Sequence, residues 1–311
     1  MVTPTAPPPP QTPSDALAWE SANRRNAALA AWAAAALTLA GAILTALAFG
    51  SLPKADATVV SITDALGHLA AGTPIPPGRA VEQLRYIGDH GLRFAIGPVL
   101  TGLGGFALYG VLAFLYRATR ARSAQMSQAA IVAAAIGAVA YGVGSLVVGV
   151  FRVLEATGLP ADATNSDAVD ALSGGPLLVG TFAQFLGGFA LGFAFVLIGL
   201  GAMRAGLLTR FMGVLGIIVG ATFVLPLDQQ GIIRSFWLVA VGALIVGRWP
   251  NGVPPAWLSG RAEPWPSARD LQQQRRPRGE ASRELPRTPA PAPPPDDNLS
   301  QGKRRKRRKR R

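Results

Sequence analysis

The chain of 311 residues contains no cysteine and only two histidines, His68 and His90. Without cysteine it can form no disulfide, no thiolate metal site and no cysteine nucleophile. The two histidines follow no zinc-ligand spacing, so we expect no metal ion and no bound cofactor. A phosphate-binding loop, a dinucleotide fingerprint and a nucleophile motif are also missing. Nothing in the sequence therefore indicates an enzyme, and we expect no catalytic residue.

Charged residues are scarce over most of the chain and concentrated near its end. Residues 1–247 hold 13 Lys/Arg and 11 Asp/Glu, whereas residues 248–311 hold 17 Lys/Arg and 6 Asp/Glu. The net charge of +13 thus describes a basic tail and not a folded basic surface.

Six apolar runs occupy most of the remaining sequence, at residues 27–50, 94–116, 129–151, 176–203, 211–227 and 232–247. A bilayer core of about 30 Å needs about 20 helical residues, so the first four are long enough to cross it. The last two are shorter and predict a tight hairpin. Because lipid cannot satisfy free backbone groups, only helices are expected. The predicted fold is all-α, a polytopic transmembrane bundle of six spans.

A secretory signal peptide is the alternative reading of the first run, since Ala46-Leu47-Ala48 resembles a cleavage site. Its 24 residues exceed the apolar stretch of about 7–15 that signal peptides use, which favours a span.

Arginine placement predicts the orientation of the bundle. Seven arginines and no acidic residue lie in the segments 24–26, 117–125 and 204–210: Arg24, Arg25, Arg117, Arg120, Arg122, Arg204 and Arg210. Cytoplasmic loops carry an excess of basic residues, so we expect a cell-membrane protein with both termini in the cytoplasm.

The predicted organisation has four parts. They are a disordered Pro-rich cytoplasmic arm (1–25), the six-span domain (26–247), a Trp/Pro-rich juxtamembrane segment along the inner headgroup layer (248–267) and a disordered basic cytoplasmic tail (268–311).

Two predicted outer loops share a pattern. Residues 52–67 read LPKADATVVSITDALG, and residues 159–174 read LPADATNSDAVDALSG. The first and second helix hairpins can therefore be tandem copies related by an axis along the membrane normal. Chance agreement in a chain rich in Ala and Asp is the alternative.

Glycine is frequent inside the apolar runs. Two Gly-xxx-Gly pairs stand out, Gly188 with Gly192 and Gly216 with Gly220. Small residues let helix backbones approach closely, so we expect these four in helix contacts. A glycine-lined hinge or permeation path is the alternative.

No Asp, Glu, Lys or His falls within the first four runs, which argues against a proton-coupled pump and against an intramembrane haem. The candidate intramembrane polar contacts are Gln184, Tyr109, Tyr141 and Ser145. Gln184 is expected to hydrogen-bond to a neighbouring helix, with a ligand contact as the sharper alternative. Asp228 and Arg234 flank the turn between the last two runs and predict an ion pair at the membrane interface.

Nine basic residues close the chain: Lys303, Arg304, Arg305, Lys306, Arg307, Arg308, Lys309, Arg310 and Arg311. On the cytoplasmic side, each basic residue near an anionic leaflet gains about 1 kcal/mol, so we expect this run to contact anionic lipid. RNA or ribosome binding and an acidic protein partner remain alternatives.

Two stretches resemble known proteins. AMRAGLLTRFMGVLGIIVG (202–220) and RWPNGVPPAWLSGRAEPWPS (248–267), followed by the Lys/Arg-rich tail, are similar to uncharacterised actinobacterial six-helix integral membrane proteins. Arg204, Arg210, Gly213 and Gly216 match that pattern. The resemblance implies a fold and a membrane location but no reaction, and the preference for Arg over Lys also favours a bacterial, GC-rich source.

Three functions remain in order of preference. The first is a non-enzymatic membrane module whose tail contacts lipid or a cytoplasmic partner. The second is a transporter or channel for a small, weakly polar solute passing near Gln184, Tyr109 and Tyr141. The last is a lipid-modifying enzyme. A cavity at the midplane that Gln184 faces would favour transport, and a solid bundle would favour the module.

Overall fold

The computed structural model describes residues 12–52, 71, 80–123, 125–225, 228, 230–250 and 252–263. These residues belong to one compact unit and form helices without any strand, so the predicted all-α fold is confirmed for them. The helices are α1 (Pro13–Gly50), α3 (Ala80–Asp89), α4 (Gly91–Arg122), α5 (Gln128–Thr157), α6 (Asn165–Ser173), α7 (Gly175–Arg204), α8 (Arg210–Val224), α9 (Ile232–Ile245) and α10 (Ala256–Ser259).

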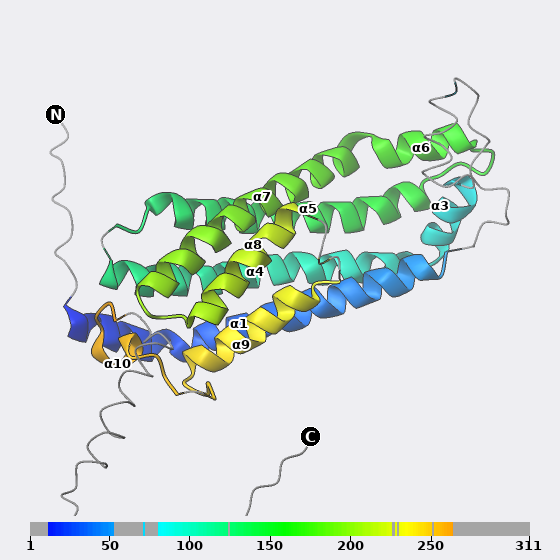
Figure 1. The fold of residues 1–311 in the computed structure, drawn as a ribbon. Helices are drawn as coiled ribbons and strands as arrows, with labels where there is room; N and C mark the ends of the chain where they lie inside the picture. Colours follow the sequence, from blue (N-terminus) through cyan, green and yellow to red (C-terminus); the bar gives the residue numbers. More distant parts are fainter. Residues whose placement is uncertain are drawn as a thin grey trace, which may run out of the picture. The chain divides into compact units, whose positions relative to one another are not determined.

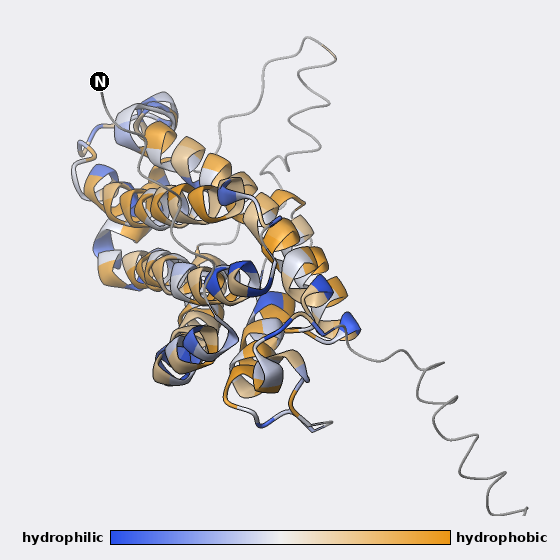
Figure 2. Cartoon of the chain, turned by 90° about the vertical axis from the view of Figure 1, so that its left-hand side faces the viewer, coloured by the Kyte–Doolittle hydropathy of each residue, from blue (hydrophilic) through white to orange (hydrophobic). Residues whose placement is uncertain are grey.

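Four helices, α1, α4, α5 and α7, are long and apolar enough to cross a membrane. Large apolar side chains point outward from them, among them Ile136 on α5 at 60% exposure and Phe182 on α7 at 58%. Figure 2 views the bundle end-on and shows hydrophobic residues over the outward sides of these helices. A surface of this kind suits lipid and not water.

The long helices lie side by side in the order α1, α4, α5, α7. The α4–α5 and α7–α8 connections and α10 lie at one end, and α3 and α6 lie at the other (Figure 1). We call the first the basic end, because Arg24, Arg122 and Arg204 lie there, and the second the acidic end, after Asp167 and Asp170 of α6.

The last two apolar runs differ from full spans. α8 has 15 residues and α9 has 14. At about 1.5 Å per residue they reach about 22 and 21 Å, short of the roughly 30 Å of a bilayer core. α8 ends and α9 begins about half-way along the bundle (Figure 1), and the Ser235 hydroxyl donates to the Ala35 carbonyl in mid-α1 over 3.2 Å. Asp228 and Gly231, which lie between the two helices, are buried and therefore sit at mid-depth in the bundle and not at one of its ends.

The N-terminal arm is shorter than the sequence predicts, because α1 already begins at Pro13. Thr12 and Asp15 form a capping box, and proline occupies the first helical turn, where it costs no hydrogen bond. The expectation of disorder up to residue 25 is thus wrong for residues 13–25. The polar composition of this segment suggested disorder, but contacts with α4 and α10 stabilise it as a helix.

Glycines bring helix backbones into close contact, as the Gly-xxx-Gly pattern suggests, but not equally. A Cβ on Gly192 would lie 2.6 Å from the Gly220 carbonyl oxygen, and one on Gly220 would lie 2.8 Å from that of Gly192. Gly216 lies against the Trp237 indole, whereas Gly188 has its nearest neighbour, the Phe223 carbonyl oxygen, at 3.4 Å from such a Cβ. The tight contact between α7 and α8 is therefore at Gly192 and Gly220.

Two apolar clusters fill the bundle. The larger surrounds Leu112, Phe195 and Trp237 in the basic half, and the smaller contains Leu84, Ile87 and Phe94 near the acidic end. The first loop of the proposed tandem repeat, residues 52–67, lies almost wholly outside the described residues, so the duplication stays a prediction.

Candidate functional site

A cavity of about 530 Å³ lies between the two apolar clusters, and we call it the central cavity. Helices α1, α4, α5, α7 and α8, together with the turn before α9 and its first residues, form its wall. Its polar and charged lining residues are Thr38, Thr45, Thr101, Tyr141, Ser145, Arg152, Gln184, Thr222, Asp228, Gln230 and Arg234. The cavity exists because the α8–α9 hairpin stops half-way, which leaves the acidic half of the bundle with four long helices and the basic half with six.

Asp228 and Arg234 line the cavity but do not form the predicted ion pair between side chains within the described part of the chain. The Asp228 carboxylate instead accepts from the backbone N–H groups of Ile233 at 3.2 Å and Arg234 at 3.0 Å. The helix N-cap residue, Gly231, has no side chain to do this. Asp228 therefore caps α9, where the helix dipole also favours a negative charge.

The Arg234 guanidinium lies over the ring of Phe223, with its central carbon 3.7 Å from the ring centroid. Arg234 is only 6% exposed, and its Nε has no hydrogen-bond partner. An aromatic face compensates part of the cost of burying a cation, while the in-plane N–H groups remain able to donate.

Arg152 provides a second cation. Its guanidinium lies 5.2 Å from the centroid of the Phe49 ring. It lines the central cavity and also a second one, of about 240 Å³, between α3, α6 and α7 at the acidic end. Arg152 thus stands between the acidic end of the bundle and the central cavity.

Gln184 and Ser145 meet on the cavity wall, where the Gln184 Nε2 donates to the Ser145 hydroxyl over 2.8 Å. The Gln184 oxygen and the Ser145 hydroxyl hydrogen are left for other partners. Tyr141 also lines the cavity, packed edge-on against Phe223. Tyr109 does not: it is 38% exposed and belongs to none of the cavity residues.

Several cavity residues were not singled out from the sequence, notably Arg152, Thr101 and Thr45. Arg152 follows directly on an apolar run and was read as its boundary, although α5 continues to Thr157. The sequence feature that could have indicated this cavity is the shortness of the last two apolar runs. Short or interrupted membrane helices often mark the place where a polar site lies inside the bundle.

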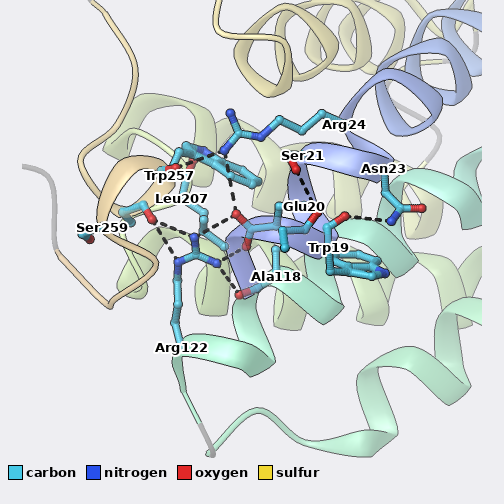
Figure 3. Close-up of polar contacts among 12 residues, drawn as sticks. Trp19, Glu20, Ser21, Asn23, Arg24, Ala118, Arg122, Leu207, Trp257 and Ser259 are labelled. Atoms are coloured by element: carbon cyan, nitrogen blue, oxygen red, sulfur yellow. Dashed lines mark hydrogen bonds and ion pairs between the residues drawn. The ribbon is translucent and has the colours of Figure 1, made fainter. Parts of the chain in front are cut away.

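The basic end holds a second cluster of charges, shown in Figure 3. Glu20 on α1 and Arg122 on α4 form an ion pair in which both side chains are fully buried. Arg122 also donates to the carbonyl oxygens of Ala118 and Ala256, and Arg24 donates to that of Trp257 over 3.0 Å. The cluster fastens the segment around α10 to the bundle.

Trp257 is the centre of this attachment. Its indole N–H donates to the Leu207 carbonyl at 2.9 Å, and its ring stacks on Phe114. It is 2% exposed, so its ring packs against protein and not against lipid headgroups. The N-terminal part of α1, which the sequence analysis assigned to a disordered arm, covers this indole through Arg24. The position of the segment 248–267 along the headgroup layer stays a prediction. Trp265 and the nine basic residues from Lys303 to Arg311 lie outside the described residues, and lipid contact by that run stays a prediction.

Comparison with known proteins identifies one family. The model of a family described as a domain of unknown function, DUF4386, matches residues 57–249. This range includes α3 to α9 and every lining residue of the central cavity except the four on α1. No curated protein and no solved structure matches the chain.

Proposed function

The chain belongs to the DUF4386 family, and from this premise and the geometry of the bundle we propose that it carries a small solute across the membrane through the central cavity. The observation behind this proposal is the cavity itself, which has a volume of about 530 Å³ and brings polar and charged side chains together at mid-depth in an otherwise apolar bundle. Polar and ionised groups inside a membrane are costly and are usually found where a substrate or ion passes. Substrate sites formed at interrupted helices near the midplane are typical of transporters.

The arrangement of the two halves supports this proposal. Toward the acidic end, Arg152 borders both the central and the second cavity. Toward the basic end, the larger apolar cluster intervenes, and the cavity beside Thr119 and Arg122 shares no lining residue with the central cavity. In alternating access, each single state of a transporter opens its substrate cavity toward one side of the membrane and closes it toward the other.

We expect a cysteine in place of Ser145 to react with a small membrane-impermeant thiol reagent from both sides of proteoliposomes, quickly from the acidic side and more slowly from the basic side. The chain has no cysteine of its own, so the signal is specific. Ala134→Cys is the matched control on α5, since Ala134 is fully buried in the larger apolar cluster. Reaction of Ser145→Cys from one side only would rule out transport, and reaction from neither would rule out the cavity.

The orientation in the membrane is part of the same proposal. We infer four full spans and one re-entrant α8–α9 hairpin, with the basic end and both termini in the cytoplasm. This replaces the six full spans predicted from the sequence and preserves an even number of crossings.

The orientation predicts an asymmetric labelling pattern in intact cells. Ser166→Cys in α6, at the acidic end, is expected to react with an impermeant thiol reagent. Ser123→Cys, after α4 at the basic end, is expected to react only once the cells are opened. The reverse pattern would show that the bundle is inverted.

A further inference from the structure

The charges around the central cavity specify the kind of solute, and this inference rests on the function proposed above. We propose that the cavity binds an organic monocarboxylate, with its carboxylate on the guanidinium of Arg234. Transport of a neutral, weakly polar solute, the sequence-based alternative, would leave that guanidinium without an anion.

Asp228 is the one carboxylate on the cavity wall among the described residues, and it is already hydrogen-bonded. Both Asp228 oxygens accept backbone N–H groups at the start of α9, at 3.2 and 3.0 Å. Within the described residues, no ion pair joins Asp228 to either Arg234 or Arg152. The negative charge of Asp228 thus stabilises a helix end, and neither guanidinium group forms an ion pair with a carboxylate in the described part of the chain.

Arg234 is the group most in need of a ligand. It is 94% buried, its Nε has no partner, and its guanidinium makes no hydrogen bond to another described residue. Phe223 covers one face at 3.7 Å. Burying an unpaired cation is costly even with a ring against it, whereas a bound carboxylate would form short, charge-assisted hydrogen bonds with the fork of N–H groups.

The charge balance favours a single negative charge. The wall formed by the described residues carries two arginines and one aspartate, a net charge of +1 that a carboxylate neutralises and a phosphate dianion exceeds. Gln184 and Ser145 can hydrogen-bond to the same solute, and Ala42, Pro98, Val148 and Phe223 offer apolar contacts for its carbon skeleton. Arg152, which borders both cavities, would attract the anion before it reaches Arg234.

The test compares three probes of one shape on the full chain in lipid nanodiscs: benzoate, its neutral isostere benzamide, and phenylphosphonate. Affinity is measured from the rise in melting temperature with probe concentration. We expect benzoate to bind at least tenfold more tightly than benzamide and than phenylphosphonate. Equal affinity for benzoate and benzamide would overturn the anion site, and tighter binding of phenylphosphonate would overturn the single charge.

Substitution locates the site. Arg234→Gln keeps N–H donors and removes a buried charge, so the variant should fold, and we expect it to lose at least tenfold in benzoate affinity while benzamide is unaffected. Arg25→Gln is the control, because Arg25 is exposed on α1 at the basic end. Unchanged benzoate binding by Arg234→Gln would contradict the assignment. Palmitate is tested in the same way, because it is a lipid-derived carboxylate and benzoate is a water-soluble one. Binding of either compound that is lost in Arg234→Gln supports the site.

This inference and the proposed transport can fail separately. If Ser145→Cys is labelled from both sides but benzoate and benzamide bind alike, transport stands and the carboxylate does not. If benzoate binds through Arg234 while Ser145→Cys reacts from one side only, the anion site stands as a binding site without transport.

Discussion

Glu20→Gln is expected to destabilise the protein by about 3 to 5 kcal/mol. Removing one partner of a buried ion pair leaves the other charge buried without compensation. Both side chains of the Glu20–Arg122 pair are fully buried, and Arg24 lies 3.8 Å from the same carboxylate. Thermal unfolding of the detergent-solubilised protein would measure the loss, and faster hydrogen exchange around Trp257 would show that the segment at α10 is released first.

Two further variants separate the charge effect from general disruption. Asp162→Asn removes a carboxylate from an exposed turn and should stay within about 0.5 kcal/mol of the parent. The double variant Glu20→Leu with Arg122→Met removes both fully buried charges and should recover more than half of the lost stability, because Arg24, which also loses its carboxylate, is partly exposed to solvent. A Glu20→Gln variant as stable as Asp162→Asn would show that the pair makes no net contribution.

Gly192→Ala is expected to destabilise the bundle by about 1 to 3 kcal/mol, the usual cost of overpacking a well-packed contact. The added methyl group would lie 2.6 Å from the Gly220 carbonyl oxygen, and a backbone atom cannot turn aside as a side chain can. α8 must then move away from α7. The readout is the melting temperature in detergent.

Gly188→Ala is the matched control, one turn earlier on the same helix. Its methyl group would meet the nearest atom at 3.4 Å, an ordinary contact. Alanine is also a better helix former than glycine by up to about 1 kcal/mol. We therefore expect Gly188→Ala to be neutral or slightly stabilising. Equal losses for the two variants would mean that backbone proximity at Gly192 is not what holds α7 and α8 together.

Much of the architecture could be predicted because membrane helices are specified locally. An apolar stretch of sufficient length must form a helix and must lie in lipid, whatever its neighbours are. The four long spans follow from this rule, as does the short length of the last two runs. Gln184 and Ser145 could be singled out because an uncharged polar residue in such a stretch is conspicuous.

The charged residues were harder to interpret, since their surroundings depend on contacts between distant segments. Asp228 and Arg234 are six residues apart, and sequence proximity suggested a pair. In the fold the carboxylate instead accepts from the backbone N–H groups of Ile233 and Arg234, and the guanidinium lies over Phe223. Glu20 was assigned to a disordered arm, although it meets Arg122, a residue 102 positions further along the chain.

The sequence by itself determined that this is an all-helical membrane protein, where its long helices lie and which of their ends is basic, because hydrophobicity and charge act through the solvent that each segment prefers. Only the tertiary structure decided that the last two helices stop half-way, that Gly231 before α9 lies beside Thr38, and that two arginines border one cavity. The reason is physical. The energy of a buried charge, and what it can bind, depend on the groups within a few ångströms of it. Those groups come from helices that are far apart in the chain.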